Sequence, residues 1–179
     1  TAVTDILTYL WSLEHRDIAM FISDDDPVSN PPMIAAYERF FAENNYPVKI
    51  ADLNTPRAIT ADTHVAVLTR YAMEVLQSKP RPTAVIGGDT YISGMQTEFS
   101  KAGVALPGAI SLVGIDDSPV ALQVKPQLTS YRFPLDEIGR ASVEELLQKI
   151  ADPSRSNRQI FLDGKIIFRE AAGPASPAV

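Results

Sequence analysis

Aspartate side chains are the residues of this sequence best placed to do chemistry, because several of them directly follow apolar runs. The clearest case is the run from Ile110 to Ile115, which ends in Asp116 and Asp117. An apolar run of this length without polar alternation is typical of a strand buried on both faces. The carboxyl end of such a strand faces the ligand crevice in open α/β sheets. We therefore expect Asp116 to contact a ligand.

Two other groups of carboxylates follow predicted strands. Asp24, Asp25 and Asp26 come after the apolar run 18–22, and Asp89 comes after the run 84–87. For both groups a structural role is the favoured interpretation. Residues 24–26 then form a solvated loop, and Asp89 caps the helix that follows it. A binding role at the same edge of the sheet is the alternative.

The same acidic residues allow an enzyme hypothesis. Asp24-Asp25-Asp26 resembles the nucleophile loop of haloacid-dehalogenase-type phosphatases, and Gly88-Asp89 and Lys79-Pro80 resemble their magnesium-binding and lysine motifs. Such an enzyme needs a carboxylate nucleophile and a magnesium ion held by a later aspartate. Ser93 and Gly94 stand where that later aspartate is required, and the lysine lies too close to the Gly-Asp pair. The magnesium-dependent phosphatase is therefore a remote alternative.

No other catalytic pattern is present in the sequence. The only histidines, His15 and His64, form no arrangement with serine and aspartate, and there is no metal-ligand spacing or phosphate-binding glycine loop. We expect a protein that is not an enzyme and that needs no cofactor and no metal.

Helical and strand patterns alternate along the sequence. This alternation predicts an α/β fold, a three-layer αβα doubly wound parallel sheet with helices on both faces. Strands are predicted at 18–22, 48–53, 84–87, 110–115 and 128–131. The helices between them are expected to begin near Thr4-Asp5, Pro31-Pro32, Thr60, Asp89 and Pro134, and the first to end in the cationic pair His15-Arg16.

The C-terminal part carries two further signals. Asp163-Gly164 between the apolar runs 159–162 and 165–168 predicts a C-terminal hairpin. Residues 171–179 are mostly small residues and prolines, so we expect a disordered tail.

Composition excludes several classes of protein. The chain has 179 residues, 45% of them hydrophobic, no cysteine and a net charge of −6. An acidic domain makes no phosphate-binding surface of its own, so we expect no nucleic-acid binding by this segment alone. No apolar stretch approaches the roughly 20 residues of a membrane span, and the absence of cysteine fits the cytoplasm. Because Thr1 is not an initiator methionine, we expect an upstream segment.

The stretch from Pro82 to Leu147 resembles the effector-binding domain of LacI/GalR-type (lactose-repressor/galactose-repressor) bacterial transcriptional regulators. The residues that carry this resemblance are Pro82-Thr83-Ala84-Val85-Ile86, Asp89, Gly94, Lys101-Ala102-Gly103, Pro107, Ile110 to Asp117 and Leu128-Thr129-Ser130. The match is looser upstream, where Arg16-Asp17-Ile18-Ala19 and Ala36-Tyr37 still fit. The resemblance implies a periplasmic-binding-protein-like (type I) fold of two lobes, with the effector between them and a helix-turn-helix headpiece upstream.

The resemblance also implies a division of the sequence. Residues 1–170 would be an effector-binding domain, in which 1–130 and 157–170 form the C-terminal lobe. In intact relatives the segment 131–151 crosses back to the N-terminal lobe, so here it would be a helix short of partners. Its apolar residues would drive pairing with a second copy or folding back on the sheet: Leu135, Ile138, Val143, Leu146, Leu147 and Ile150.

The effector-binding residues that the resemblance implies are Asp116, Met33, Gly88, Asp89, Asp24 and Phe133. At Asp116 a carboxylate can accept hydrogen bonds from sugar or nucleoside hydroxyls. Met33 stands where sugar-binding members usually have arginine, Gly88 where they often have asparagine, and Thr63-His64 where they often have an aromatic ring. The effector is therefore a sugar or a related small molecule whose identity the sequence leaves open.

The favoured function is the ligand-sensing and dimerising part of a LacI-type DNA-binding regulator, a cytoplasmic homodimer. Operator DNA would be bound only through the upstream headpiece, and no membrane is involved. The alternative is an extracytoplasmic sugar- or solute-binding protein of a transporter, which shares the fold.

Overall fold

A five-stranded mixed sheet forms the centre of the molecule. The computed structural model describes residues 1–22, 30–47 and 61–176, except for the side chains of 61–64. The strand order is β1-β2-β3-β4-β5; the first four strands are parallel and the last is antiparallel to its neighbour. The strands are β1 (Ile18–Met20), β2 (Ala84–Gly88), β3 (Ser111–Ile115), β4 (Thr129–Arg132) and β5 (Lys165–Ile167). The predicted parallel sheet is confirmed, while the strand expected at 48–53 lies outside the described residues.

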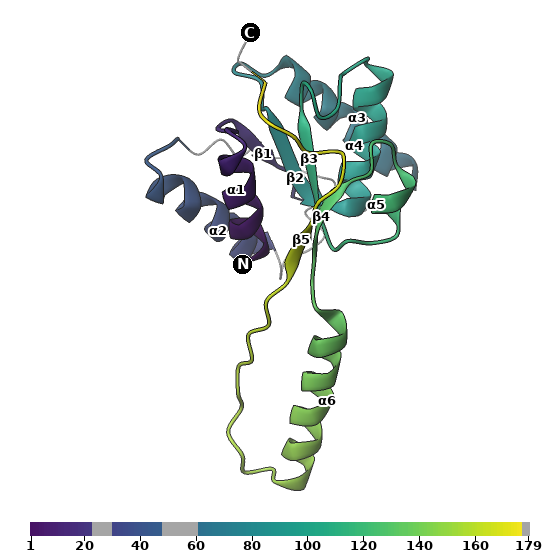
Figure 1. Cartoon of the computed structure of the whole chain (residues 1–179). Coiled ribbons are helices and arrows are strands. Elements are labelled where there is room, and N and C mark those ends of the chain that lie inside the picture. The colour runs from purple at the N-terminus through teal and green to yellow at the C-terminus, as the bar shows by residue number, and fades with distance from the viewer. Residues whose placement is uncertain (23–29, 48–60, 177–179) are drawn as a thin grey trace.

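Helices cover both faces of this sheet, as the alternating pattern predicted. In Figure 1, α1 and α2 lie on one side of the sheet, and α3, α4 and α5 lie on the other. The helices are α1 (Ala2–Ser12), α2 (Asn30–Glu43), α3 (Ala61–Gln77), α4 (Asp89–Lys101), α5 (Val120–Gln123) and α6 (Leu135–Ala151). Among the described residues, no helix has both the length and the apolar character that crossing a membrane requires.

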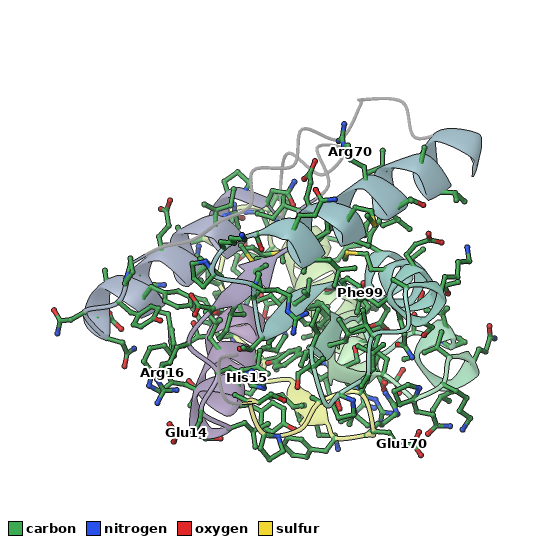
Figure 2. The ribbon with its side chains drawn as sticks, turned by 90° about the horizontal axis from the view of Figure 1, so that it is seen from above. Glu14, His15, Arg16, Arg70, Phe99 and Glu170 are labelled. Carbon is green, nitrogen blue, oxygen red and sulfur yellow. The ribbon has the colours of Figure 1, made fainter. Side chains whose placement is uncertain are left out.

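Alternate residues of the strands build two separate cores. Met20, Ile86 and Val113 pack with α1 and α2, and Val85 and Leu112 pack with α3 and α4. All residues of β3 are buried, which confirms the interpretation of its apolar run as a central strand. In Figure 2, Phe99 lies within the packed side chains, whereas Glu14, Arg70 and Glu170 lie towards the outside. Each fully buried aliphatic side chain contributes about 1.5 to 3 kcal/mol to such a core.

Helix α6 is not part of either core. It has no buried residue, and the side chains of Leu135, Leu147 and Ile150 are 67%, 60% and 66% exposed. Figure 1 shows α6 and the returning segment extending away from the sheet. We call α6 together with residues 152–164 the arm. The expectation that this helix is short of partners within its own polypeptide is confirmed, and the helix does not fold back on the sheet.

The first helix begins and ends earlier than predicted. Thr1, not Thr4-Asp5, is its N-cap, because the Thr1 hydroxyl accepts a hydrogen bond from the Thr4 amide at 3.3 Å. The helix ends at Ser12, so His15 does not lie in its last turn. Instead, the imidazole of His15 is buried, with Nδ1 2.9 Å from Thr83 Oγ1 and Nε2 2.9 Å from the Gly173 carbonyl.

The C-terminal segment is packed rather than disordered over residues 171–176. Ala171 is fully buried, and its carbonyl accepts a hydrogen bond from the Leu112 amide at 2.8 Å. The Ala175 amide donates to the Leu13 carbonyl at 2.8 Å. Small residues let this segment run closely along the lobe, so the prediction of a disordered tail is wrong for these residues.

The predicted C-terminal hairpin is also wrong. β5 pairs with β4, with Arg132 opposite Lys165, and the run 159–162 is not a strand. Gly164 is required for a different reason. A Cβ there would lie 2.4 Å from Tyr131 Cε1, and its amide donates to the Tyr131 hydroxyl at 3.1 Å. The Asp-Gly signal therefore marks a close approach to β4 instead of a two-residue turn.

Candidate functional site

The turn after β3 has an unusual backbone. Asp116 has a φ of 106° and Asp117 a φ of 49°, both positive in residues other than glycine. Such conformations cost on the order of 1 to 3 kcal/mol each, persist only where the surroundings fix them, and cluster at functional sites. The turn lies at the carboxyl edge of the parallel strands, where α/β sheets bind ligands.

Three successive amide groups fix this turn. The Asp116 amide donates to the Tyr131 carbonyl at 2.9 Å, and the Asp117 amide donates to Ser130 Oγ at 3.0 Å. The Ser118 amide donates to Asp89 Oδ2 at 2.6 Å. Partners on β4 and at the start of α4 therefore hold the strained backbone in one conformation.

Asp89 is a buried acceptor and not a helix cap. The N-cap position of α4 is Gly88, without a side-chain hydrogen bond, and Asp89 is only 1% exposed. Its carboxylate accepts from the Ser118 amide and from the Ser130 hydroxyl, the latter at 2.6 Å. These two donors engage the side chain away from the helix end, so the prediction of a cap is wrong.

Burial sets the electrostatics of this carboxylate. Desolvation raises the pKa of Asp89, the hydrogen bonds from Ser130 and Ser118 oppose that rise, and the nearby charge of Asp117 adds to it. The carboxylate lies so close to β3 that a Cβ at Gly114 would stand 1.9 Å from Asp89 Oδ1. Only glycine therefore fits at position 114 while Asp89 keeps its partners.

Asp117 joins two arginines from different segments. Its side chain is 3% exposed, and its Oδ2 accepts from Arg132 Nε at 2.5 Å. Its Oδ1 accepts from Arg169 Nη2 at 2.5 Å. Sequence reasoning missed Arg132, Arg169 and Ser130, because Arg169 lies 52 residues from Asp117 and reaches it only through the pairing of β4 with β5.

Asp116 is the carboxylate left available at this edge. Its side chain is exposed, and within the described part of the protein it has no hydrogen-bond or ion-pair partner. Partial desolvation raises its pKa, and the charge of Asp89 raises it further. Asp116 lines a hollow of about 480 Å³ between the sheet edge and the base of the arm. That volume is in the range of small-molecule sites. Other lining residues are Arg132, Phe133, Asp136, Asp163 and Lys165.

The structure brings together only some of the predicted binding residues. Phe133 lines the hollow and packs edge-on against Tyr131, with ring centroids 5.3 Å apart. Gly88 ends β2, close to Asp89. Met33 is half-buried on α2 and packs against the core on that side, and it is not among the residues lining the hollow. Asp24 lies outside the described residues, as does the side chain of His64.

The described residues do not assemble a metal centre. They contain no group of three histidine, cysteine, aspartate or glutamate side chains arranged to hold an ion. The carboxylate of Asp89, the magnesium ligand of the phosphatase hypothesis, is engaged by Ser118 and Ser130 instead.

Known proteins resemble nearly all of this sequence. The sequence model of the periplasmic binding protein-like domain matches residues 7–171. The HTH-type transcriptional repressor PurR of Vibrio parahaemolyticus is 28% identical over 162 residues, which are 90% of this chain and 47% of that protein. The lactose operon repressor of Klebsiella pneumoniae is 25% identical over 173 residues, 95% of this chain and 46% of that protein. The chain therefore spans about half the length of these relatives.

Solved structures support the same fold. A LacI family transcriptional regulator from Enterococcus faecium with bound ribose superposes with a TM-score of 0.81 at 22% identity, covering 98% of this chain and 63% of that one. The lac repressor dimer bound to operator and the anti-inducer ONPF gives a TM-score of 0.78 at 20% identity, covering 96% of this chain and 58% of that one. The chain therefore belongs to the periplasmic binding protein-like domain family, as an effector-binding domain of the LacI type.

Proposed function

We propose that this domain binds a small polar effector at the carboxyl edge of the sheet and, within a longer LacI-type regulator, converts that binding into a change in operator affinity. Operator DNA would be bound through an N-terminal helix-turn-helix headpiece, and the regulator would act as a cytoplasmic homodimer. The net charge of −6 supports the assignment of DNA contacts to another segment.

The exposed carboxylate of Asp116 is the observation that carries this proposal. It stands on a strained turn that three hydrogen bonds hold in place, and it has no partner of its own among the described residues. A carboxylate in such a position can accept hydrogen bonds from the hydroxyl groups of a ligand in the adjoining hollow. Phe133 adds an apolar ring to the same wall.

Asp24, Gly88, Asp89 and Met33 have less support as direct contacts. Asp89 is buried and saturated by donors from its own lobe, so its contribution would be to hold the turn. Met33 is not among the residues that line the hollow beside Asp116. The effector class remains sugar-like, because relatives and neighbours include a ribose operon repressor of Haemophilus influenzae and a regulator with bound ribose.

Calorimetric titration with a sugar panel tests this function. D-ribose, D-glucose, sucrose and cellobiose are the probes, since structural neighbours carry these ligands. At least one should bind the wild-type protein, and Asp116→Ala should weaken that binding by about tenfold or more through loss of the acceptor. Glu144→Ala removes an exposed carboxylate of α6 that does not line the hollow; it is the control and should bind as the wild type does. Equal binding by wild type and Asp116→Ala would refute the role of Asp116.

The transporter alternative has less support than the regulator. The curated relatives described above are transcriptional repressors and not enzymes or transport proteins. The phosphatase alternative loses support from the engagement of Asp89 with Ser118 and Ser130.

A further inference from the structure

One buried carboxylate joins the proposed effector site to both segments that lead to the arm. Asp117 follows Asp116 in the strained turn. It accepts from Arg132 on the outgoing strand β4 and from Arg169 just after the returning strand β5. Three segments far apart in the sequence therefore meet at a single side chain.

The two arginines differ in what else holds them. Arg169 is 10% exposed, and it also donates through Nη1 to the Leu128 carbonyl at 2.7 Å. Arg132 is 50% exposed; its Nε donates a hydrogen bond to Asp117 Oδ2, and its Nη2 forms an ion pair with the same oxygen. The Asp117 carboxylate thus links the turn to the outgoing segment through Arg132 and to the returning segment through Arg169.

Charge makes this link specific. A buried carboxylate between two guanidinium groups forms charge-assisted hydrogen bonds to both. An asparagine keeps one carbonyl oxygen and no charge, so it cannot hold both arginines. The two segments would then move independently of the turn that presents Asp116.

We propose that Asp117 is a positioning residue that transmits the state of the effector site to the arm. The inference rests on the proposed function, because the signal begins with a ligand at Asp116. Binding there would stiffen the turn, and Asp117 would pass that stiffening to residues 132–135 through Arg132 and to residues 165–169 through Arg169. The coupling between the effector site and the arm would then depend on the Asp117 side chain and not only on the pairing of β4 with β5.

Residue-resolved amide hydrogen exchange with and without D-ribose tests the proposal. In the wild-type protein, added D-ribose should slow exchange at 116–118, 132–135 and 165–169 together. In Asp117→Asn the slowing should remain at 116–118 and be lost in the other two segments, a difference of about tenfold. Glu145→Gln is the matched control, because Glu145 also lies between two arginines, Arg155 and Arg158, but within the arm. It should behave as the wild type does.

The outcomes separate the two proposals. Equal slowing of all three segments in wild type and Asp117→Asn would overturn the role of Asp117. No slowing at 116–118 in the wild type with D-ribose, D-glucose, sucrose or cellobiose would count against the proposed function. In that case a comparison of the wild type with Asp117→Asn in the absence of ligand tests the role of Asp117. The substitution should speed exchange of the Gly164 and Arg169 amides about tenfold. Unchanged rates would overturn the proposal.

Should Asp117→Asn fail to fold, Arg132→Gln replaces it. Only the outgoing link is then removed. Slowing by D-ribose should persist at 165–169 and disappear at 132–135. Persistence in both segments would overturn the proposal.

Discussion

Helices α1 and α6 are both amphipathic, but only α1 buries its apolar face. α1 completely buries Ile6, Leu7 and Leu10 against the sheet, whereas α6 buries none of its residues. The sheet-bearing lobe is held by contacts between distant segments. The arm is held by local ones, such as the ion pair of Arg155 with Glu145 at 2.7 Å and the hydrogen bond from Lys149 to the Arg155 carbonyl. An apolar stripe therefore specifies a helix and a face, but it does not specify what covers that face.

The largest expected effect contrasts one core residue with one arm residue. Ile86→Ala in β2 should reduce the free energy of unfolding by about 3 to 4 kcal/mol, because Ile86 is fully buried. Leu147→Ala in α6 should change it by less than about 0.5 kcal/mol, because that side chain is 60% exposed. Urea unfolding at low protein concentration measures both. A comparable loss in the two variants would break the contrast between lobe and arm.

The next effect concerns the carboxylate that holds the turn. Asp89→Ala leaves the Ser118 amide and the Ser130 hydroxyl without their acceptor, and should cost about 2 to 3 kcal/mol. Asp163→Ala removes an exposed carboxylate of the arm and should be nearly neutral. Thermal unfolding measures the stability of both variants. If Asp89→Ala leaves the stability unchanged, other contacts must fix the turn.

Association of the protein is a third expectation. The apolar side chains on α6 are exposed to solvent, and the helix does not fold back on the sheet. Because exposed apolar surface favours association, we expect α6 to pair with a second copy at high protein concentration. Light scattering should show a mass that rises with concentration, and Leu147→Lys should weaken that rise. A monomer at all concentrations would contradict the expectation.

The smallest effect is a pH dependence within the lobe. Burial lowers the pKa of His15 below 6.5, the Gly173 carbonyl opposes this, and Arg16 adds to it. Between the folded-state pKa and 6.5 the unfolded state binds a proton that the folded state lacks, so stability should fall as pH decreases through that window. His15→Gln should flatten this slope in urea unfolding. The raised pKa values of Asp89 and Asp116 act in the opposite direction at lower pH, because there the folded state binds the extra proton.

Local sequence patterns predicted the helices and strands better than they predicted which residues contact each other. The assignment of the apolar run of β3 to a buried strand follows from a short-range rule, and it is confirmed. The carboxylate of Asp89 could not be assigned from sequence, because a cap and a buried acceptor look alike until Ser130 is placed beside it. The Asp163-Gly164 signal failed for the same reason, since only the packing of Tyr131 explains the glycine.

The site was predicted in part. Asp116 follows the strand as expected, and Phe133 lines the same hollow. The Asp117 link depends on β4 and β5 lying in register, a long-range pairing that no local pattern encodes. Met33 was assigned by resemblance alone, and it is not among the residues that line the hollow.

Mapping of amide chemical shifts by NMR during titration with D-ribose tests the central claim most directly. The largest shifts should fall on 116–118 and 132–135, around the hollow beside Asp116, and Asp116→Ala should remove them. Shifts confined to another face of the lobe, such as the groove between α3 and α4 that Leu68 and Thr97 line, would contradict this expectation, as would unchanged shifts in Asp116→Ala.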